Sequence, residues 1–183
     1  MEVLYYVATS LDGCIADRDG GVDWLTPFQG GGEDHGYAEM YASVDAILMG
    51  SRTYELALRV APEYEPDKPT SVFTKRDLPV PHPAATTLTG EDPRKVVEDL
   101  AARGHRRAWL MGGGELAASF LERGLITHHQ VFVVPVVLGG GIPLFGRLGG
   151  GPIGLEMTGT HRYANGIVRL DYEPAATDRK PGG

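Results

Sequence analysis

The sequence predicts a single α/β domain with a mixed sheet, mostly parallel, that ends in an antiparallel hairpin. Apolar, β-rich segments alternate with segments of helical periodicity over the first two thirds of the chain. The last third is β-rich and contains Ala164-Asn165-Gly166, a strong hairpin signal. No linker-like stretch divides the chain, so we expect one domain over residues 1–173 and a flexible polar tail over residues 174–183.

The individual elements follow from local pattern. Strands are expected where short apolar runs end at turn residues, at residues 3–9, 45–49, 70–73, 86–88, 108–111, 126–138, 155–163 and 167–172. Helices are expected where apolar residues recur at intervals of three or four, at residues 37–44, from 53, 93–103 and 115–123. Pro93 fits the first position of a helix, whereas Pro135 predicts a bulge or an edge within its strand.

Composition excludes several classes of function. The chain has 183 residues, 42% of them hydrophobic, and a net charge of −7, which argues against a nucleic-acid partner. No run of 18 or more apolar residues predicts a membrane span. The N-terminus reads as a strand rather than a signal peptide, and a single cysteine, Cys14, excludes an internal disulfide and a multi-cysteine zinc site. We therefore expect a cytoplasmic protein without a bound metal.

Three predicted strands end in residues that suit phosphate. Residues 49–53 place a glycine, a hydroxyl and Arg52 at a helix start, and residues 72–76 place Lys75 and Arg76 directly after a strand. Residues 110–116 place three glycines at another helix start, where bare amides suit a pyrophosphate. In open α/β sheets, ligands gather at such carboxyl ends.

Each of these signals has an ordinary structural alternative. A glycine between strand and helix is commonly a turn, and Lys75 and Arg76 also fit a solvated pair. Gly112-x-Gly114-x-x-Ala117 formally matches the Rossmann fingerprint, but the next strand ends without the acidic residue that the fingerprint requires. Taken together, the three strand ends favour a dinucleotide, and the two cations favour the 2′-phosphate of NADP over NAD.

The motifs, in their order, resemble those of a known family. They are Ala8-Thr9-Ser10-Leu11-Asp12-Gly13-x-Ile15-Ala16, Met49-Gly50-Ser51-Arg52-Thr53-Tyr54-Glu55, Gly112-Gly113-Gly114-Glu115-Leu116 and the stretch from Pro135 to Phe145. Over residues 3–172 the chain resembles the dihydrofolate reductase-like superfamily, and within it the RibD C-terminal reductase domain of riboflavin biosynthesis.

The resemblance implies NADPH across the carboxyl edge of the sheet. It implies that Ala8 and Ile15 line the nicotinamide, and that residues Thr74, Lys75 and Arg76 hold the adenosine phosphate. The residues implied for the other phosphates are Gly50, Ser51, Arg52, Thr53, Gly112, Gly113, Gly114, Glu115 and Leu116.

The substrate side carries fewer signals. Asp34 falls near the place where dihydrofolate reductases use a carboxylate to grip the pterin, so it is our candidate catalytic acid, with helix-dipole stabilisation as the alternative. Asp12, Trp24 and Tyr37 are candidates for the substrate pocket; Asp12 also fits a turn former, and both aromatic residues also fit the core. Cys14 stands where riboflavin reductase domains usually carry Lys or Arg, which sets this chain apart from them.

The function expected is hydride transfer from NADPH to a small heterocycle, of pteridine or aminopyrimidine type, with 5-amino-6-(5-phosphoribosylamino)uracil as one candidate. The alternatives are a dihydrofolate reductase-type activity and a nucleotide-binding regulatory domain without catalysis. A homodimer is expected, because strand 131–138 and the final hairpin offer sheet edges that need covering.

Overall fold

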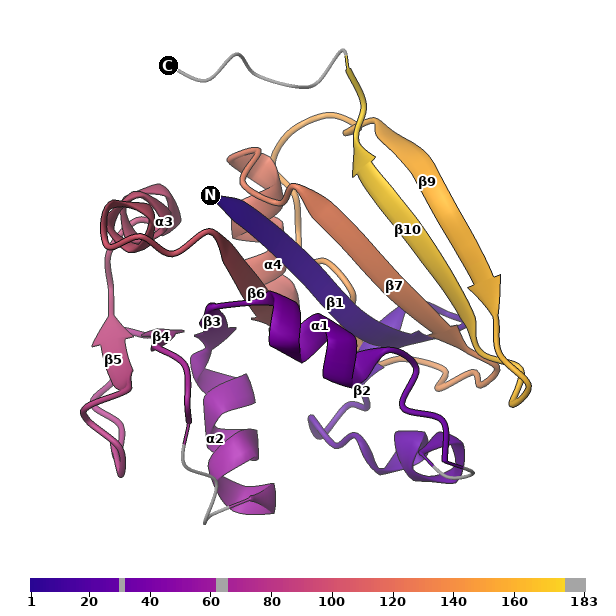
Figure 1. The fold of residues 1–183 in the computed structure, drawn as a ribbon. Coiled ribbons are helices and arrows are strands. Elements are labelled where there is room, and N and C mark those ends of the chain that lie inside the picture. The colour runs from indigo at the N-terminus through magenta and orange to yellow at the C-terminus, as the bar shows by residue number, and fades with distance from the viewer. Residues whose placement is uncertain (30–31, 62–65, 177–183) are drawn as a thin grey trace.

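The computed structural model describes residues 1–29, 32–61 and 66–176, and the predicted tail falls mostly outside these ranges. Its centre is an eight-stranded sheet in the order β5-β4-β3-β6-β1-β7-β10-β9 (Figure 1). Helices cover both faces of this sheet. The α/β fold class predicted from the sequence is confirmed.

The described elements fall into one large sheet, one small sheet and the helices. The large sheet contains β1 (Glu2–Ser10), β3 (Ala46–Gly50), β4 (Thr70–Phe73), β5 (Thr86–Thr89), β6 (Arg107–Gly112), β7 (His128–Val134), β9 (Leu155–Arg162) and β10 (Val168–Pro174). The small sheet pairs β2 (Cys14–Ala16) with β8 (Ile142–Pro143). The helices are η1 (Asp23–Phe28, a 3-10 helix), α1 (Tyr37–Ser43), α2 (Ser51–Val60), α3 (Pro93–Ala102) and α4 (Gly114–Glu122).

The sheet is parallel along most of its width. β1 pairs in parallel with both β6 and β7, and β3, β4 and β5 continue the parallel part. β10 is antiparallel to β7 and to β9, and the turn between β9 and β10 places Gly166 at φ +89°, which suits glycine. The predicted mixed sheet and its final hairpin are therefore present.

Alternating side chains divide the core between the two faces of the sheet. Val3 and Tyr5 of β1 face the same side as Phe120 of α4, and all three are fully buried. Leu4 faces the other side and packs with Met40 of α1. Figure 1 shows α1 in front of the sheet and α4 behind it. This layering leaves the carboxyl ends of β1, β3 and β6 open to a ligand.

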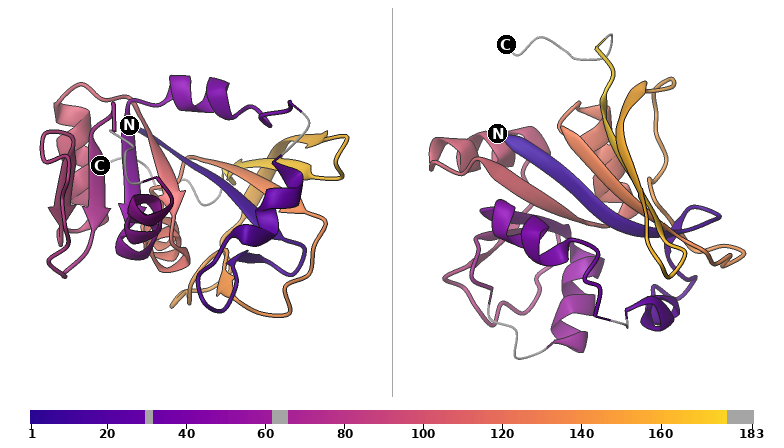
Figure 2. Two further views of the ribbon diagram at one scale, coloured as in Figure 1. Left: turned by 90° about the horizontal axis from the view of Figure 1, so that it is seen from below. Right: turned by 45° about the vertical axis from the view of Figure 1, so that its right-hand side comes forward.

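Four details differ from the sequence-based expectation. β7 ends at Val134, so Pro135 terminates the strand and no bulge forms within it. The short pair β2–β8 lies where only loops were expected. Pro174, expected in the tail, is the last residue of β10 and pairs with Leu155. β7 lies between β1 and β10, so of the two predicted open edges only the hairpin provides one, at β9 (Figure 2, right).

Candidate active site

A large cleft opens at the carboxyl ends of β1, β3 and β6, with a volume of about 1140 Å³. Its walls come from segments far apart in the sequence, including β1, β2, the start of α2, the start of α4, and β8 with the preceding Gly141. Eleven of the fourteen predicted cofactor residues line it: Ala8, Ile15, Gly50, Ser51, Arg52, Thr53, Gly112, Gly113, Gly114, Glu115 and Leu116. The structure thus brings two of the three predicted strand ends into one cavity.

Two helix N-termini face this cleft without a side-chain cap. Gly50 precedes α2 and Gly113 precedes α4, and no described side chain forms a capping hydrogen bond at either helix start. The two starts are neighbours, because a β-carbon on Gly113 would lie 3.9 Å from the Gly50 Cα. Uncapped backbone N–H groups at adjacent helix starts, beside Arg52, form a cradle with the chemistry that a pyrophosphate requires.

The third predicted strand end lies at the rim of the cleft rather than in its wall. Phe73, the last residue of β4, lines the cleft, but residues 74–76 do not. The Thr74 hydroxyl accepts a hydrogen bond from the backbone N–H of Arg76. Arg76 itself forms a two-point ion pair with Glu55, a cleft residue of α2. The segment is therefore tied to the cleft through Glu55, while Lys75 is exposed beside it.

One end of the cleft is apolar and aromatic. Tyr6 of β1 and Trp109 of β6 line it together with Met111, and the two rings meet edge to face with their centroids 6.1 Å apart. The Trp109 indole Nε1 donates to the Tyr6 carbonyl, and the Tyr6 hydroxyl lies 3.5 Å from the His35 carbonyl. These polar groups are already engaged, so the wall offers ring surface to a ligand. Burial raises the pKa of the Tyr6 hydroxyl, which keeps it protonated.

Of the three predicted substrate-pocket residues, none lines the cleft directly. Tyr37, on α1, stacks on Tyr41 and meets Tyr6 and Trp109 edge to face, so it packs against the residues of the aromatic wall. Trp24 lies in η1 and packs against the cluster around Phe132, while its neighbours Val22 and Leu25 line the cleft.

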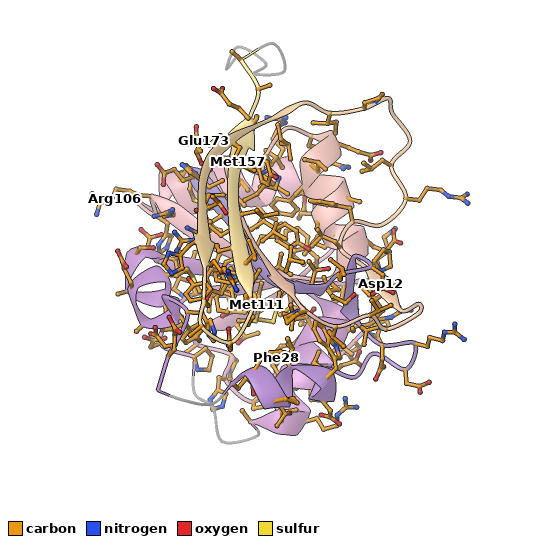
Figure 3. The ribbon with its side chains drawn as sticks, turned by 90° about the vertical axis from the view of Figure 1, so that its right-hand side faces the viewer. Asp12, Phe28, Arg106, Met111, Met157 and Glu173 are labelled. Carbon is orange, nitrogen blue, oxygen red and sulfur yellow. The ribbon has the colours of Figure 1, made fainter. Side chains whose placement is uncertain are left out.

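Asp12 has a structural partner. Its carboxylate accepts hydrogen bonds from the backbone N–H groups of Leu138 at 3.0 Å and Gly139 at 2.9 Å. The Leu138 bond is the main reason that the pKa of Asp12 falls to about 2. Figure 3 shows Asp12 set apart from Met111, which lies in the cleft wall. The side chain therefore fastens the loop after β1 to the loop after β7.

Asp34 lies two residues before Gly36, the N-cap residue of α1, and its side chain reaches the first turn of the helix. Its two carboxylate oxygens accept from the backbone N–H groups of Gly36 at 2.9 Å and Ala38 at 3.0 Å. These bonds, the Ala38 bond first, lower the pKa of Asp34, whereas a proton donor requires a raised pKa. Asp34 is absent from the cleft wall. The structure therefore favours the alternative interpretation, a residue that stabilises the helix start.

Several cleft residues escaped the sequence-based prediction. Tyr6, Trp109 and Met111 belong to apolar strands, where their pattern indicates core and nothing more. Glu55, Leu56 and Arg59 follow Arg52 at intervals of three, four and seven residues, which is a helical spacing that would have marked one face of α2.

The eight-stranded sheet and the cleft at its carboxyl edge define a reductase-type domain with the dihydrofolate reductase-like fold. The chain belongs to the RibD C-terminal domain family, whose model matches residues 2–169. This confirms the resemblance found in the sequence.

Individual relatives agree with this assignment. The chain is 36% identical over 172 residues to the uncharacterized protein YwjB of Bacillus subtilis (strain 168), covering 93% of this chain and 97% of YwjB. It is 32% identical over 154 residues to the riboflavin biosynthesis protein RibD of Mycobacterium tuberculosis (strain ATCC 25618 / H37Rv), covering 75% of this chain but 43% of RibD. A crystal structure of a putative riboflavin biosynthesis protein from Shewanella sp. PV-4 superposes with a TM-score of 0.87 at 28% identity, covering 96% and 99% of the two chains.

The described residues hold no group of three or more His, Cys, Asp or Glu side chains arranged to bind a metal ion. Within the same ranges, every helix is too short or too polar to cross a membrane.

Proposed function

We propose that this protein is an NADPH-dependent reductase of a small heterocyclic substrate. One observation carries the proposal: a single cleft joins an uncapped, glycine-lined cradle with Arg52 to a wall formed by Tyr6, Trp109 and Met111. The cradle suits the phosphates of a dinucleotide, and the aromatic wall suits a flat ring. Family membership supports a reductase over other dinucleotide-binding functions.

Different parts of the cleft would bind different parts of the cofactor and the substrate. Amides at the starts of α2 and α4 would hold the phosphates, and Arg52 would balance their charge. Ala8 and Ile15 line the same cleft as the aromatic wall, so a ring held against them would face a substrate on Tyr6 and Trp109. NADPH, when bound, supplies the hydride. The protein would align the two rings and exclude water between them.

The substrate class is proposed as a pteridine or an aminopyrimidine, with 5-amino-6-(5-phosphoribosylamino)uracil among the compounds to test. Two alternative functions fit the same cleft. In a dihydrofolate reductase-type activity, a larger pterin would bind in the cleft beside the cofactor. In a nucleotide-binding domain without catalysis, only the cradle would be occupied. Loss of nicotinamide absorbance against a panel of pterins and ribosylaminopyrimidines separates these candidates, since binding of NADPH without turnover on any compound would favour the non-catalytic domain.

The cofactor assignment is tested by binding. Arg52→Ala and Lys75→Ala are each expected to weaken NADPH binding by about 1–3 kcal/mol if their charges meet phosphate. Arg106→Ala is the matched control, because Arg106 is exposed and precedes the amino end of β6, opposite the cleft. If the parent protein and the three variants bound NADPH equally well, the proposed positions of the phosphates would be wrong.

We also propose that the protein forms a homodimer through the open edge at β9. Seven of the eight residues of β9 are exposed, among them Leu155 and Met157, and Figure 3 shows Met157 on this hairpin. An uncovered edge strand with apolar side chains is a site for pairing with another copy. Light scattering on the purified protein, and on a Met157→Lys variant expected to be monomeric, tests this proposal.

A further inference from the structure

Glu55 and Arg76 form a bidentate ion pair at the rim of the cleft. Arg76 donates from Nη1 to Oε1 of Glu55 at 3.1 Å and from Nη2 to Oε2 at 2.6 Å. Glu55 lies in the second turn of α2 and lines the cleft, whereas Arg76 lies in the segment after β4. Each side chain is about half exposed, at 43% and 53%, so neither partner of the pair is buried by the protein.

The pair is ionised at neutral pH. The hydrogen bonds from Arg76 lower the pKa of Glu55, and those same bonds raise the pKa of Arg76. Both terminal nitrogens of the guanidinium already bind the carboxylate, which therefore occupies the fork that a phosphate would use. The carboxylate also adds a negative charge at the place where a phosphate dianion would arrive.

The segment that carries Arg76 has little freedom to move away from α2. The Tyr54 hydroxyl, on the residue before Glu55, donates to the Pro79 carbonyl at 2.9 Å. The Thr74 backbone N–H donates to the Thr89 carbonyl of β5 at 2.8 Å. The backbone is therefore held on both sides of Arg76, which keeps the base of its side chain beside Glu55.

We infer that Glu55 sets the preference of this protein between NADPH and NADH by competing with the 2′-phosphate for Arg76. The inference rests on the proposed dinucleotide function and adds a residue that determines its cofactor selectivity. The two cofactors differ only in the 2′-phosphate. A change at Glu55 that frees Arg76 therefore alters the affinity for one cofactor and leaves the other nearly unchanged.

Two fragments isolate this effect. 2′,5′-ADP carries the 2′-phosphate and 5′-AMP lacks it. The difference between their affinities, measured by calorimetric titration, therefore gives the contribution of the 2′-phosphate to binding. Because an exposed ion pair is weak, Glu55→Gln is expected to tighten 2′,5′-ADP binding by about three- to tenfold. The affinity for 5′-AMP is expected to change by less than about twofold, since no contact with Arg76 is involved.

Glu115→Gln provides the matched control. Glu115 also lines the cleft, at the start of α4, but it forms no ion pair with a described residue. Its neutralisation is expected to change NADP⁺ and NAD⁺ affinities by the same factor, because both carry the pyrophosphate. The double variant Glu55→Gln/Arg76→Gln is expected to lose the gain seen in Glu55→Gln alone.

The outcomes separate the inference from the proposed function. Unchanged or weaker 2′,5′-ADP binding in Glu55→Gln, with normal NADPH binding in the parent protein, would overturn the role of Glu55 and leave the reductase proposal standing. Weaker binding would mean that Glu55 orients Arg76 toward the phosphate. Failure of the parent protein to bind either dinucleotide would instead remove the proposed function, and the inference with it.

Discussion

The carbonyl oxygen of Pro143 lies directly against Gly114, the first residue of α4. A β-carbon at position 114 would stand 2.3 Å from that oxygen, which is closer than any real contact. A hydrogen bond from the Gly146 N–H to the Gly114 carbonyl, at 2.8 Å, fixes the same approach. The loop after β8 therefore rests on the start of α4, and glycine is needed there because a side chain would have no room.

We expect Gly114→Ala to destabilise the protein by about 1–3 kcal/mol, because the loop or the helix start must move apart. It should also weaken dinucleotide binding, since the displaced backbone is part of the cradle. Gly150→Ala is the control: a β-carbon there meets no atom within 4 Å. Chemical denaturation of both variants measures the difference, and equal stability of the two would contradict the contact.

His129 is a buried base, and no residue in the described ranges forms an ion pair with it. Its side chain on β7 is 1% exposed, and neither ring nitrogen makes a hydrogen bond of normal geometry. Burial lowers the pKa of His129 to about 4, although the Tyr172 backbone opposite acts in the other direction. The unfolded chain takes up a proton near the ordinary histidine pKa of about 6.5. Between these two pH values the unfolded state binds more protons, so stability must rise with pH.

We therefore expect His129 to reduce the free energy of unfolding progressively as pH falls from about 6.5 to about 4, by roughly 3 kcal/mol over the full window. Above that window the penalty is absent. Denaturant unfolding of the parent and of His129→Gln at several pH values isolates this term, because all other groups cancel in the difference. His161→Gln, on exposed β9, controls for the loss of an imidazole. A difference that stays constant with pH would refute the assignment.

The fold was predictable because its information is local. The strands β3, β4 and β5 are short apolar or β-branched runs between turn residues, and they formed within one residue of their expected bounds. The pairing of β2 with β8 was not predictable, since it joins residues about 126 positions apart and contains only three and two residues. Pro135 ended its strand because the ring removes the backbone donor that the next ladder bond requires.

The candidate site was predictable only where backbone chemistry marks it. Glycines at 50 and 112–114 indicated the cradle only in combination, because a single glycine between strand and helix is commonly a turn. Tyr6 and Trp109 gave no signal, because a side chain that lines a cleft from a strand has the same pattern as one in the core. The engagement of Arg76 by Glu55 depends on how α2 packs beside the segment after β4, which is a tertiary relationship without a sequence signature.

Asp12 should control the order of the loop after β7. Its carboxylate holds the backbone N–H groups of Leu138 and Gly139, and its pKa near 2 lies below the ordinary value. The stabilisation is therefore present above the ordinary pKa and is lost as pH falls through about 2. We expect Asp12→Ala to speed amide hydrogen exchange in residues 138–141 at neutral pH. Asp77→Ala, an exposed residue after β4, is the control. Unchanged amide hydrogen exchange in Asp12→Ala would contradict the proposal that Asp12 orders this loop.

Asp34 offers a test that separates capping from catalysis. The asparagine amide has one acceptor oxygen where the Asp34 carboxylate uses two, and alanine has none. If Asp34 acts through its bonds to Gly36 and Ala38, Asp34→Asn should keep part of the stability and turnover, and Asp34→Ala should lose more of both. If the carboxylate itself takes part in the reaction, the two variants should lose turnover equally while NADPH affinity stays unchanged.

The pKa of Asp34 is lowered, so its carboxylate is ionised throughout the range from about pH 5 to 8. We therefore also expect Asp34→Asn to leave the shape of the pH–rate profile in that range unaltered. Steady-state turnover, NADPH titration and thermal unfolding of the three proteins decide between these roles.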